Sequence, residues 1–118
     1  MPENRAFKTL VTVAPTKKNY VFVVPSSSGL DLKKAAAAVG EKSVSMIKQS
    51  ELLPLTGYIH GGCSPVGMKK AFPTFIHETA QLFDTICVSA GRRGLQMELA
   101  PDTLLNVIGG SYADLTEE

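Results

Sequence analysis

Two runs of β-branched and apolar residues open the chain. Phe7–Val13 is rich in the β-branched residues valine and threonine, and Tyr20–Val24 is apolar or aromatic at every position. Both compositions are typical of strands, and a run without polar positions indicates a strand at the centre of a sheet. The segment Ala14–Asn19 between them carries a proline and two lysines and is expected to be a turn. The sequence therefore predicts a hairpin with a long loop.

The pattern then changes to a helical period. Asp31 stands where an acid stabilises the start of a helix, and Gly40 fits the position just beyond its end. Between them, apolar residues recur at helical spacing, namely Leu32, Ala35, Ala36 and Val39. Small residues on this face predict close packing of the helix against the sheet.

The middle of the chain is less regular. Ser43–Ile47 is expected to be a short strand, and Ser50 to cap a single helical turn at residues 51–53 that Pro54 ends. Phe72–Ile76 predicts a short strand with a proline that an edge position tolerates. His77–Leu82 is expected to be irregular or a single turn.

The last third predicts a hairpin and a helix. Thr85–Ser89 and Leu95–Leu99 have strand composition, and the five residues between them, 90–94, include two glycines and are expected to form the hairpin loop. Pro101 is suited to the first turn of a helix that runs to about Val107 and ends at Gly109–Gly110. The tail from Ser111 is short and acidic.

Hairpins separated by helices predict an α+β fold. We expect residues 1–118 to form a single domain with a mixed, mostly antiparallel sheet that is curled and barrel-like and is flanked by helices. No internal repeat or linker divides the chain.

Charge and composition exclude several classes. The formal net charge is +1, which argues against a protein that coats nucleic acid non-specifically. No apolar run approaches the roughly 20 residues that span a bilayer, and the first residues lack the pattern of a secretory signal. Cys63 and Cys87 are then expected to be reduced thiols in the cytoplasm, and no membrane partner is expected.

The basic residues occur in pairs. Four doublets are present: Lys17–Lys18, Lys33–Lys34, Lys69–Lys70 and Arg92–Arg93. A solvated surface explains any single doublet. The last two lie beside glycine-rich turns, however, and would contact phosphates together if those turns converge.

The segment Tyr58–Lys70 is the strongest candidate for a binding site. It contains three glycines and a proline between residues 61 and 67, so its backbone can reach conformations that other residues avoid. Such a loop can turn several N–H groups toward one oxygen atom of a ligand. A tight connection without function has the same composition, so that alternative stays open for the loop. Two alternatives also stay open for Lys8, which is either a solvent-facing strand residue or a cation directed into a cleft.

The sequence does not present standard catalytic machinery. Cys63 lies in the glycine-rich loop, and His60 and His77 are the available imidazole bases, so a cysteine–histidine hydrolase is conceivable but no spacing supports it. The histidines and cysteines lack the spacing of a metal site, and no nucleotide-binding fingerprint is present, so no metal and no cofactor are expected. What remains is a site made from backbone amides, a lysine and two glycine-rich loops.

Taken together and in order, these segments resemble the YbaK/EbsC family, free-standing relatives of the editing domain of bacterial prolyl-tRNA synthetases. The matching segments are Phe7–Val11, Leu30–Lys34, Thr56–Tyr58, Gly61–Gly67 with Lys69–Lys70, Pro73–Thr74 and Ser89–Leu95. The resemblance extends from about Arg5 to the C-terminal tail. It implies an enzyme that hydrolyses mischarged aminoacyl-tRNA, most typically cysteine esterified to the proline tRNA. A hydrophobic synthetic site separates such similar side chains by only about 10–200-fold, so a second site is required.

The resemblance also implies roles for particular residues. The lysine of the first strand, Lys8, would hold the reactive end, and a loop with a Gly-x-x-x-Pro pattern, matched by Gly61 to Pro65, would bind the aminoacyl group through its backbone. In the family the substrate's own thiol is thought to attack its ester, which agrees with the absence of a protein nucleophile. The substrate-binding residues implied are Gly61, Gly62, Cys63, Ser64, Pro65, Gly67, Ser89, Gly91 and Gln96. The residues implied to contact tRNA phosphates are Lys69, Lys70, Arg92 and Arg93.

The sequence departs from the family in two respects. Relatives carry an N-terminal section with a functional tyrosine before the strand of Lys8, so this chain is expected to be shortened, as a fragment, a truncated product or a form that a partner completes. Gln96 stands where some relatives have an aspartate. The missing section leaves open a non-catalytic module that binds aminoacyl-tRNA, and a deacylase of Ala-tRNA(Pro) is a second alternative. The partners implied are the proline tRNA and prolyl-tRNA synthetase.

Overall fold

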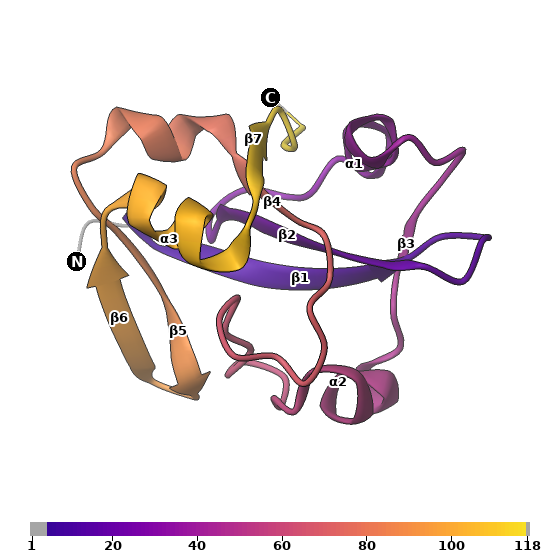
Figure 1. Cartoon of the computed structure of the whole chain (residues 1–118), viewed down its shortest axis with the longest axis horizontal. Helices are drawn as coiled ribbons and strands as arrows, with labels where there is room; N and C mark the ends of the chain where they lie inside the picture. The colour runs from indigo at the N-terminus through magenta and orange to yellow at the C-terminus, as the bar shows by residue number, and fades with distance from the viewer. Residues whose placement is uncertain (1–4, 118) are drawn as a thin grey trace.

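The computed structural model of the protein describes residues 5–117. Along this range the elements follow one another as β1 (Phe7–Val13), β2 (Asn19–Pro25), α1 (Leu32–Val39), β3 (Ser45–Met46), α2 (Gln49–Thr56), β4 (Thr74–His77), the 3-10 helix η2 (Glu78–Leu82), β5 (Ile86–Arg92), β6 (Leu95–Leu99), α3 (Pro101–Ile108) and β7 (Ser111–Ala113). In Figure 1, β1 and β2 cross the middle of the molecule, with α1 and α2 on opposite sides of them.

The strands form two sheets. Five strands are arranged in the order β3-β1-β2-β4-β7, and β5 and β6 form a separate hairpin. The pairs β1–β2 and β1–β3 are antiparallel, whereas β2–β4 and β4–β7 are parallel. A single bridge between Ala6 and Cys87 connects the two sheets. The α+β class and the mixed sheet are confirmed, but the sheet is open and not a closed barrel.

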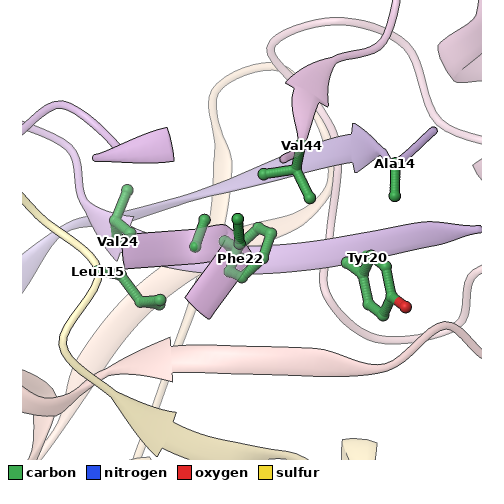
Figure 2. Close-up of a cluster of buried hydrophobic side chains, with 8 residues drawn as sticks. Ala14, Tyr20, Phe22, Val24, Val44 and Leu115 are labelled. Carbon is green, nitrogen blue, oxygen red and sulfur yellow. The ribbon is translucent and has the colours of Figure 1, made fainter. Parts of the chain in front are cut away.

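β2 is the central strand, as its uninterrupted apolar sequence predicts. Alternate side chains point to opposite faces of a strand. Tyr20, Phe22 and Val24 pack with the α1 residues Ala35 and Ala36. Figure 2 shows this cluster, in which Leu115 from the C-terminal segment lies beside Val24 and Phe22. The small side chains of α1 permit the close approach that the sequence predicts.

The opposite face of β2 packs against the rest of the protein. Val23 belongs to a cluster with Phe7, Ile86 and Leu104, which joins the sheet to the β5–β6 hairpin and to α3. Val21 packs with Val11, Leu52 and Cys63, which joins the sheet to α2 and the glycine-rich loop. Burial of each large apolar side chain contributes roughly 1.5–3 kcal/mol, so these two clusters fix the loop and the hairpin against β1.

Helix α2 is longer than predicted. The sequence predicts a single turn ended by Pro54, but the helix runs from Gln49 to Thr56 and includes this proline. Pro54 removes one hydrogen bond near the helix end, and three other interactions compensate. The Glu51 carboxylate accepts from the Lys48 N–H, Gly57 N–H donates to the Leu53 carbonyl, and the Thr56 hydroxyl donates to the Leu52 carbonyl.

Two further boundaries differ from the prediction. β5 extends to Arg92 with an irregularity between Ser89 and Arg92, and Arg92 pairs with Leu95, so the hairpin turn contains two residues and not five. The tail contains a strand, β7, that the sequence does not reveal, because its partner β4 lies far away in the chain. A β-carbon at Gly110 would lie 2.8 Å from the Thr74 carbonyl oxygen, so a glycine is required where β7 approaches β4.

None of the helices described within residues 5–117 has the length and apolar character needed to cross a bilayer.

A buried histidine fixes the C-terminal segment. The Leu115 N–H donates to His77 Nδ1 at 3.0 Å, and Thr116 Oγ1 lies 3.3 Å from His77 Nε2. Because Nδ1 accepts a hydrogen bond, it carries no proton, and the ring is neutral. The Asp31 N–H donates to the Leu115 carbonyl, and Lys34 Nζ donates to the Thr116 carbonyl, so α1 holds the same segment from the other side.

We expect His77 to make the stability of the protein depend on pH. Burial lowers the pKa of His77 below its usual 6.5, despite the opposing influence of Asp114 and Glu78. As the pH falls, the His77 side chain therefore binds a proton more readily in the unfolded chain than in the folded one. The free energy of unfolding is then highest above about pH 6.5, the pKa in the unfolded chain, and falls as the pH drops toward the lower pKa of the folded protein. Thermal unfolding between pH 8 and 5 measures this. His77→Asn keeps an acceptor near the Nδ1 position and should lose most of the pH dependence above pH 5; an unchanged slope would contradict the assignment.

Candidate functional site

A cavity of about 290 Å³ lies along the edge of β1. Its walls come from β1, the start of the segment after β2, α2, the glycine-rich loop and the β5–β6 hairpin. The lining residues are Phe7, Lys8, Thr9, Leu10, Ser26, Leu52, His60, Gly61, Cys63, Ser89 and Gln96. The structure thus brings together five residues that the sequence singles out from four separate segments: Lys8, Gly61, Cys63, Ser89 and Gln96.

Lys8 is the cationic residue in the described lining of this cavity. It lies on β1 between Phe7, which is buried, and Thr9, which is partly buried. It pairs with Val24 of β2, and its own side chain is partly buried. Within residues 5–117, no aspartate or glutamate lines the cavity and no carboxylate forms an ion pair with Lys8. Its ammonium group is therefore available to an anionic or polarised oxygen of a ligand.

The glycine-rich loop has a backbone that requires its glycines. Gly61 and Gly67 have φ values of 83° and 75°, and the Gly62 N–H donates to the Ile59 carbonyl in a tight turn. After this turn, Ser64 Oγ accepts from the Val66 N–H at 3.2 Å. The loop is therefore a shaped structure and not an extended connection.

The loop and the hairpin are in direct contact. A β-carbon at Gly62 would lie 3.1 Å from the Arg93 nitrogen and 3.2 Å from the Arg92 carbonyl carbon. Arg93 Nε donates to the His60 carbonyl at 2.9 Å. The two glycine-rich turns therefore converge. This is the arrangement that the basic residues beside them require in order to contact phosphates together.

Tyr58 joins the two turns from a second side. Its hydroxyl donates to the Val66 carbonyl at 2.5 Å, and a β-carbon at Gly91 would lie only 3.1 Å from Cε1 of its ring. Gly91 has a φ of 103°, which favours glycine, and its missing side chain leaves room for the Tyr58 ring at the irregularity of β5. The sequence does not reveal this contact, because it depends on the packing of two distant segments.

Several predicted binding residues do not line the cavity. Gly62, Ser64 and Pro65 are buried within the loop, Gly67 lies against the Tyr58 hydroxyl, and Gly91 lies against the Tyr58 ring. These residues shape the loop and support it. Lys69, Lys70, Arg92 and Arg93 are exposed, with Arg93 also bound to the loop backbone.

Cys63 is a poor nucleophile in this position. Its side chain is buried in the cluster with Val11 and Leu52, and burial raises the pKa of its thiol to about 11. The thiolate, which is the reactive form, is therefore scarce near neutral pH. His77 is bound to the C-terminal segment and is not a partner for it. His60 does line the cavity, but the raised pKa of the thiol leaves the cysteine–histidine hydrolase without an activated nucleophile.

Sequence reasoning missed about half of the cavity wall. Phe7, Thr9 and Leu10 are the strand neighbours of Lys8 and could have been included for that reason. Leu52 was not identified because α2 was predicted to be shorter. Ser26 was not identified because the run Ser26–Ser28 has the composition of a flexible connection. His60 was considered only as a base for Cys63.

Comparison with known proteins agrees with this geometry. The model of the family described as "Aminoacyl-tRNA editing domain" matches residues 1–107, and the chain belongs to this family. The resemblance to the YbaK/EbsC proteins is thereby confirmed.

Individual relatives are similar over nearly the whole chain. A protein of Enterococcus faecalis (strain ATCC 700802 / V583) named "Putative Cys-tRNA(Pro)/Cys-tRNA(Cys) deacylase EbsC" is 51% identical over 114 residues, which cover 97% of this chain and 70% of that protein. A crystal structure described as "a putative trans-editing enzyme for prolyl tRNA synthetase" superposes with a TM-score of 0.89 at 29% identity and covers 98% of this chain and 73% of its own. The crystal structure of "hypothetical protein APE2540" has a TM-score of 0.91 at 24% identity, covers 99% of this chain and 77% of its own, and shows the shared fold.

Proposed function

We propose that the protein is a trans-editing deacylase that hydrolyses mischarged aminoacyl-tRNA, with Cys-tRNA(Pro) as its substrate. The observation that carries this proposal is a cavity that combines a cation, Lys8, and a glycine-rich backbone with a buried, unreactive thiol at Cys63. Such a cavity can position an ester, and its thiol is not activated to attack it. Membership in the editing-domain family and the name of the E. faecalis relative support the same activity.

The reaction then uses the substrate's own thiol. The cysteine sulfur attacks the carbonyl carbon of its ester, the bond from this carbon to the ribose oxygen breaks, and the thiol proton passes to the leaving oxygen. Water then opens the resulting thiolactone to free cysteine. Positioning of two groups within one molecule can supply about 7–11 kcal/mol of the barrier, so no protein nucleophile is required.

The protein contributes charge stabilisation and orientation. Negative charge develops on the carbonyl oxygen during the attack, and Lys8 and backbone N–H groups of the loop from Gly61 would stabilise it. The exposed cations Lys69, Lys70, Arg92 and Arg93 flank the two converging turns and would contact phosphates of the acceptor end. Prolyl-tRNA synthetase, which generates the substrate, is the proposed partner, and the cytoplasm is the proposed location.

The experiment is a deacylation assay on purified Cys-tRNA(Pro), Ala-tRNA(Pro) and Pro-tRNA(Pro). Rapid release of cysteine with Pro-tRNA(Pro) left intact supports the proposal. Preferential release of alanine would replace it with the alanine-specific alternative. Binding of tRNA that weakens with salt, without deacylation at any protein concentration, would show a non-catalytic module.

Cys63→Ala separates the substrate-assisted mechanism from a protein nucleophile. We expect the rate on Cys-tRNA(Pro) to stay within about threefold of the unmodified protein, because the buried thiol takes no part in the reaction. Loss of the buried sulfur should lower the free energy of unfolding by about 1 kcal/mol, which thermal unfolding measures. Complete inactivation of a variant that remains folded would overturn the mechanism.

A further inference from the structure

On the side of β1 that faces away from β2, the stretch around Thr9 has no partner strand within the described residues. β3 pairs with β1 at Thr12 and Val13, and β5 meets the other end through the bridge between Ala6 and Cys87. The edge around Thr9 lies between these contacts. Thr9 lines the reaction cavity and also a neighbouring cleft of about 170 Å³ between β1 and α2.

The hydroxyl of Thr9 differs from those of three other threonines. Thr12, Thr56 and Thr74 each donate to a backbone carbonyl, at distances of 3.0, 2.8 and 2.9 Å. Thr9 Oγ1 is buried and has no hydrogen-bond partner within the described residues 5–117. A buried hydroxyl without a hydrogen-bond partner destabilises the folded protein, so this group is a candidate to hydrogen-bond a ligand.

The chemistry of the cavity restricts which ligand group this is. Lys8 and the loop amides are hydrogen-bond donors and suit the ester carbonyl oxygen. The remaining polar group of the aminoacyl moiety is its amino group, which requires acceptors. Among the described residues 5–117 no carboxylate lines the cavity, so the side-chain acceptors are the oxygens of Thr9, Ser26, Ser89 and Gln96 and the ring of His60.

Thr9 itself is partly buried, but its Oγ1 atom is fully buried and has no hydrogen-bond partner within the described residues. Ser89 Oγ already accepts from the Gly91 N–H, and Ser26, His60 and Gln96 are exposed to solvent. We propose that Thr9 binds the α-amino group of the aminoacyl ester, as a positioning residue of the reaction; this inference rests on the proposed function. Once the carbonyl and amino groups are held, the third substituent of the α-carbon, the thiol-bearing side chain, has a fixed direction toward the ester.

The test compares Cys-tRNA(Pro) with 3-mercaptopropionyl-tRNA(Pro), which keeps the thiol and the ester but lacks the amino group. Each rate is divided by the spontaneous hydrolysis rate of the same ester, because an amino group itself activates the ester. The unmodified protein should prefer the cysteinyl substrate by roughly tenfold, the change expected from one hydrogen bond. Thr9→Val, which has nearly the same shape, should lose this preference, and Thr9→Ser should keep it.

Thermal unfolding gives an independent readout. Because the hydroxyl has no partner in the protein, Thr9→Val should unfold at the same temperature as the unmodified protein or at a higher one. A lower unfolding temperature would reveal a structural partner and contradict the proposal, as would a Thr9→Val variant that retains the preference for the amino group. Absence of deacylation of either substrate by the unmodified protein would instead contradict the proposed function itself.

Discussion

Replacement of Lys8 by alanine should lower the rate of Cys-tRNA(Pro) hydrolysis by about 10²–10³-fold, the effect typical of removing a group that stabilises a developing oxyanion. Lys8 is the cation among the residues that line the cavity, and no carboxylate of the described chain pairs with it. Its charge is therefore available to the reaction and contributes little to the fold. Single-turnover kinetics with saturating protein measure the loss in the chemical step.

Lys33→Ala is the matched control. Lys33 is exposed on α1 and does not line the cavity, so its removal changes the net charge equally but should leave the rate unchanged. The free energy of unfolding of both variants should stay within about 0.5 kcal/mol of the unmodified protein. A Lys8→Ala variant that retains its rate would remove Lys8 from the mechanism.

The second large effect is expected at Gly62. Its β-carbon position is 3.1–3.2 Å from backbone atoms of Arg92 and Arg93, which cannot move as a flexible side chain does. Gly62→Ala should therefore separate the loop from the hairpin, at a cost of about 1–3 kcal/mol in the free energy of unfolding. Deacylation should fall by at least about tenfold, because the carbonyl-binding loop and the cavity wall at Ser89 no longer keep their spacing.

Gly94→Ala controls for the loss of a glycine in the same hairpin. Gly94 has a φ of 76°, so alanine there is strained by about 1–2 kcal/mol, but no atom lies within 4 Å of its β-carbon position. We expect this variant to lose stability and keep its rate at a temperature where it is folded. Equal loss of activity in both variants would show that general destabilisation, and not the contact at Gly62, is responsible.

Local patterns in the sequence predict the parts of this fold that local forces determine. The bounds of β1 follow from its β-branched composition and those of β6 from side-chain alternation. The capped ends of α1 follow from an acidic N-cap and a C-terminal glycine. α2 was mispredicted because Pro54 dominates the local pattern, whereas burial of Leu52 and the capping contacts determine the outcome. β7 depends on pairing with β4 and has no local signal.

In the candidate site, too, some residues could be predicted from local motifs and others depend on tertiary packing. Lys8 and Gly61, which line the cavity and are proposed to hold the reacting ester, could be selected because their motifs are distinctive. The supporting contacts could not, since Tyr58 meets Gly91 and Arg93 meets His60 only after two distant turns converge. For the same reason Thr9 could not be identified, because an unpartnered hydroxyl becomes visible only once the surrounding hydrogen bonds are known.

The central claim is that the cavity positions a substrate that supplies its own nucleophile. The most direct test compares single-turnover hydrolysis of Cys-tRNA(Pro) and Ala-tRNA(Pro), prepared on the same tRNA, by the unmodified protein. These substrates differ by one sulfur atom. The account predicts rapid release of cysteine and release of alanine at close to the spontaneous rate. Equally rapid release of both amino acids would contradict it, since the sulfur would then have no part in the reaction.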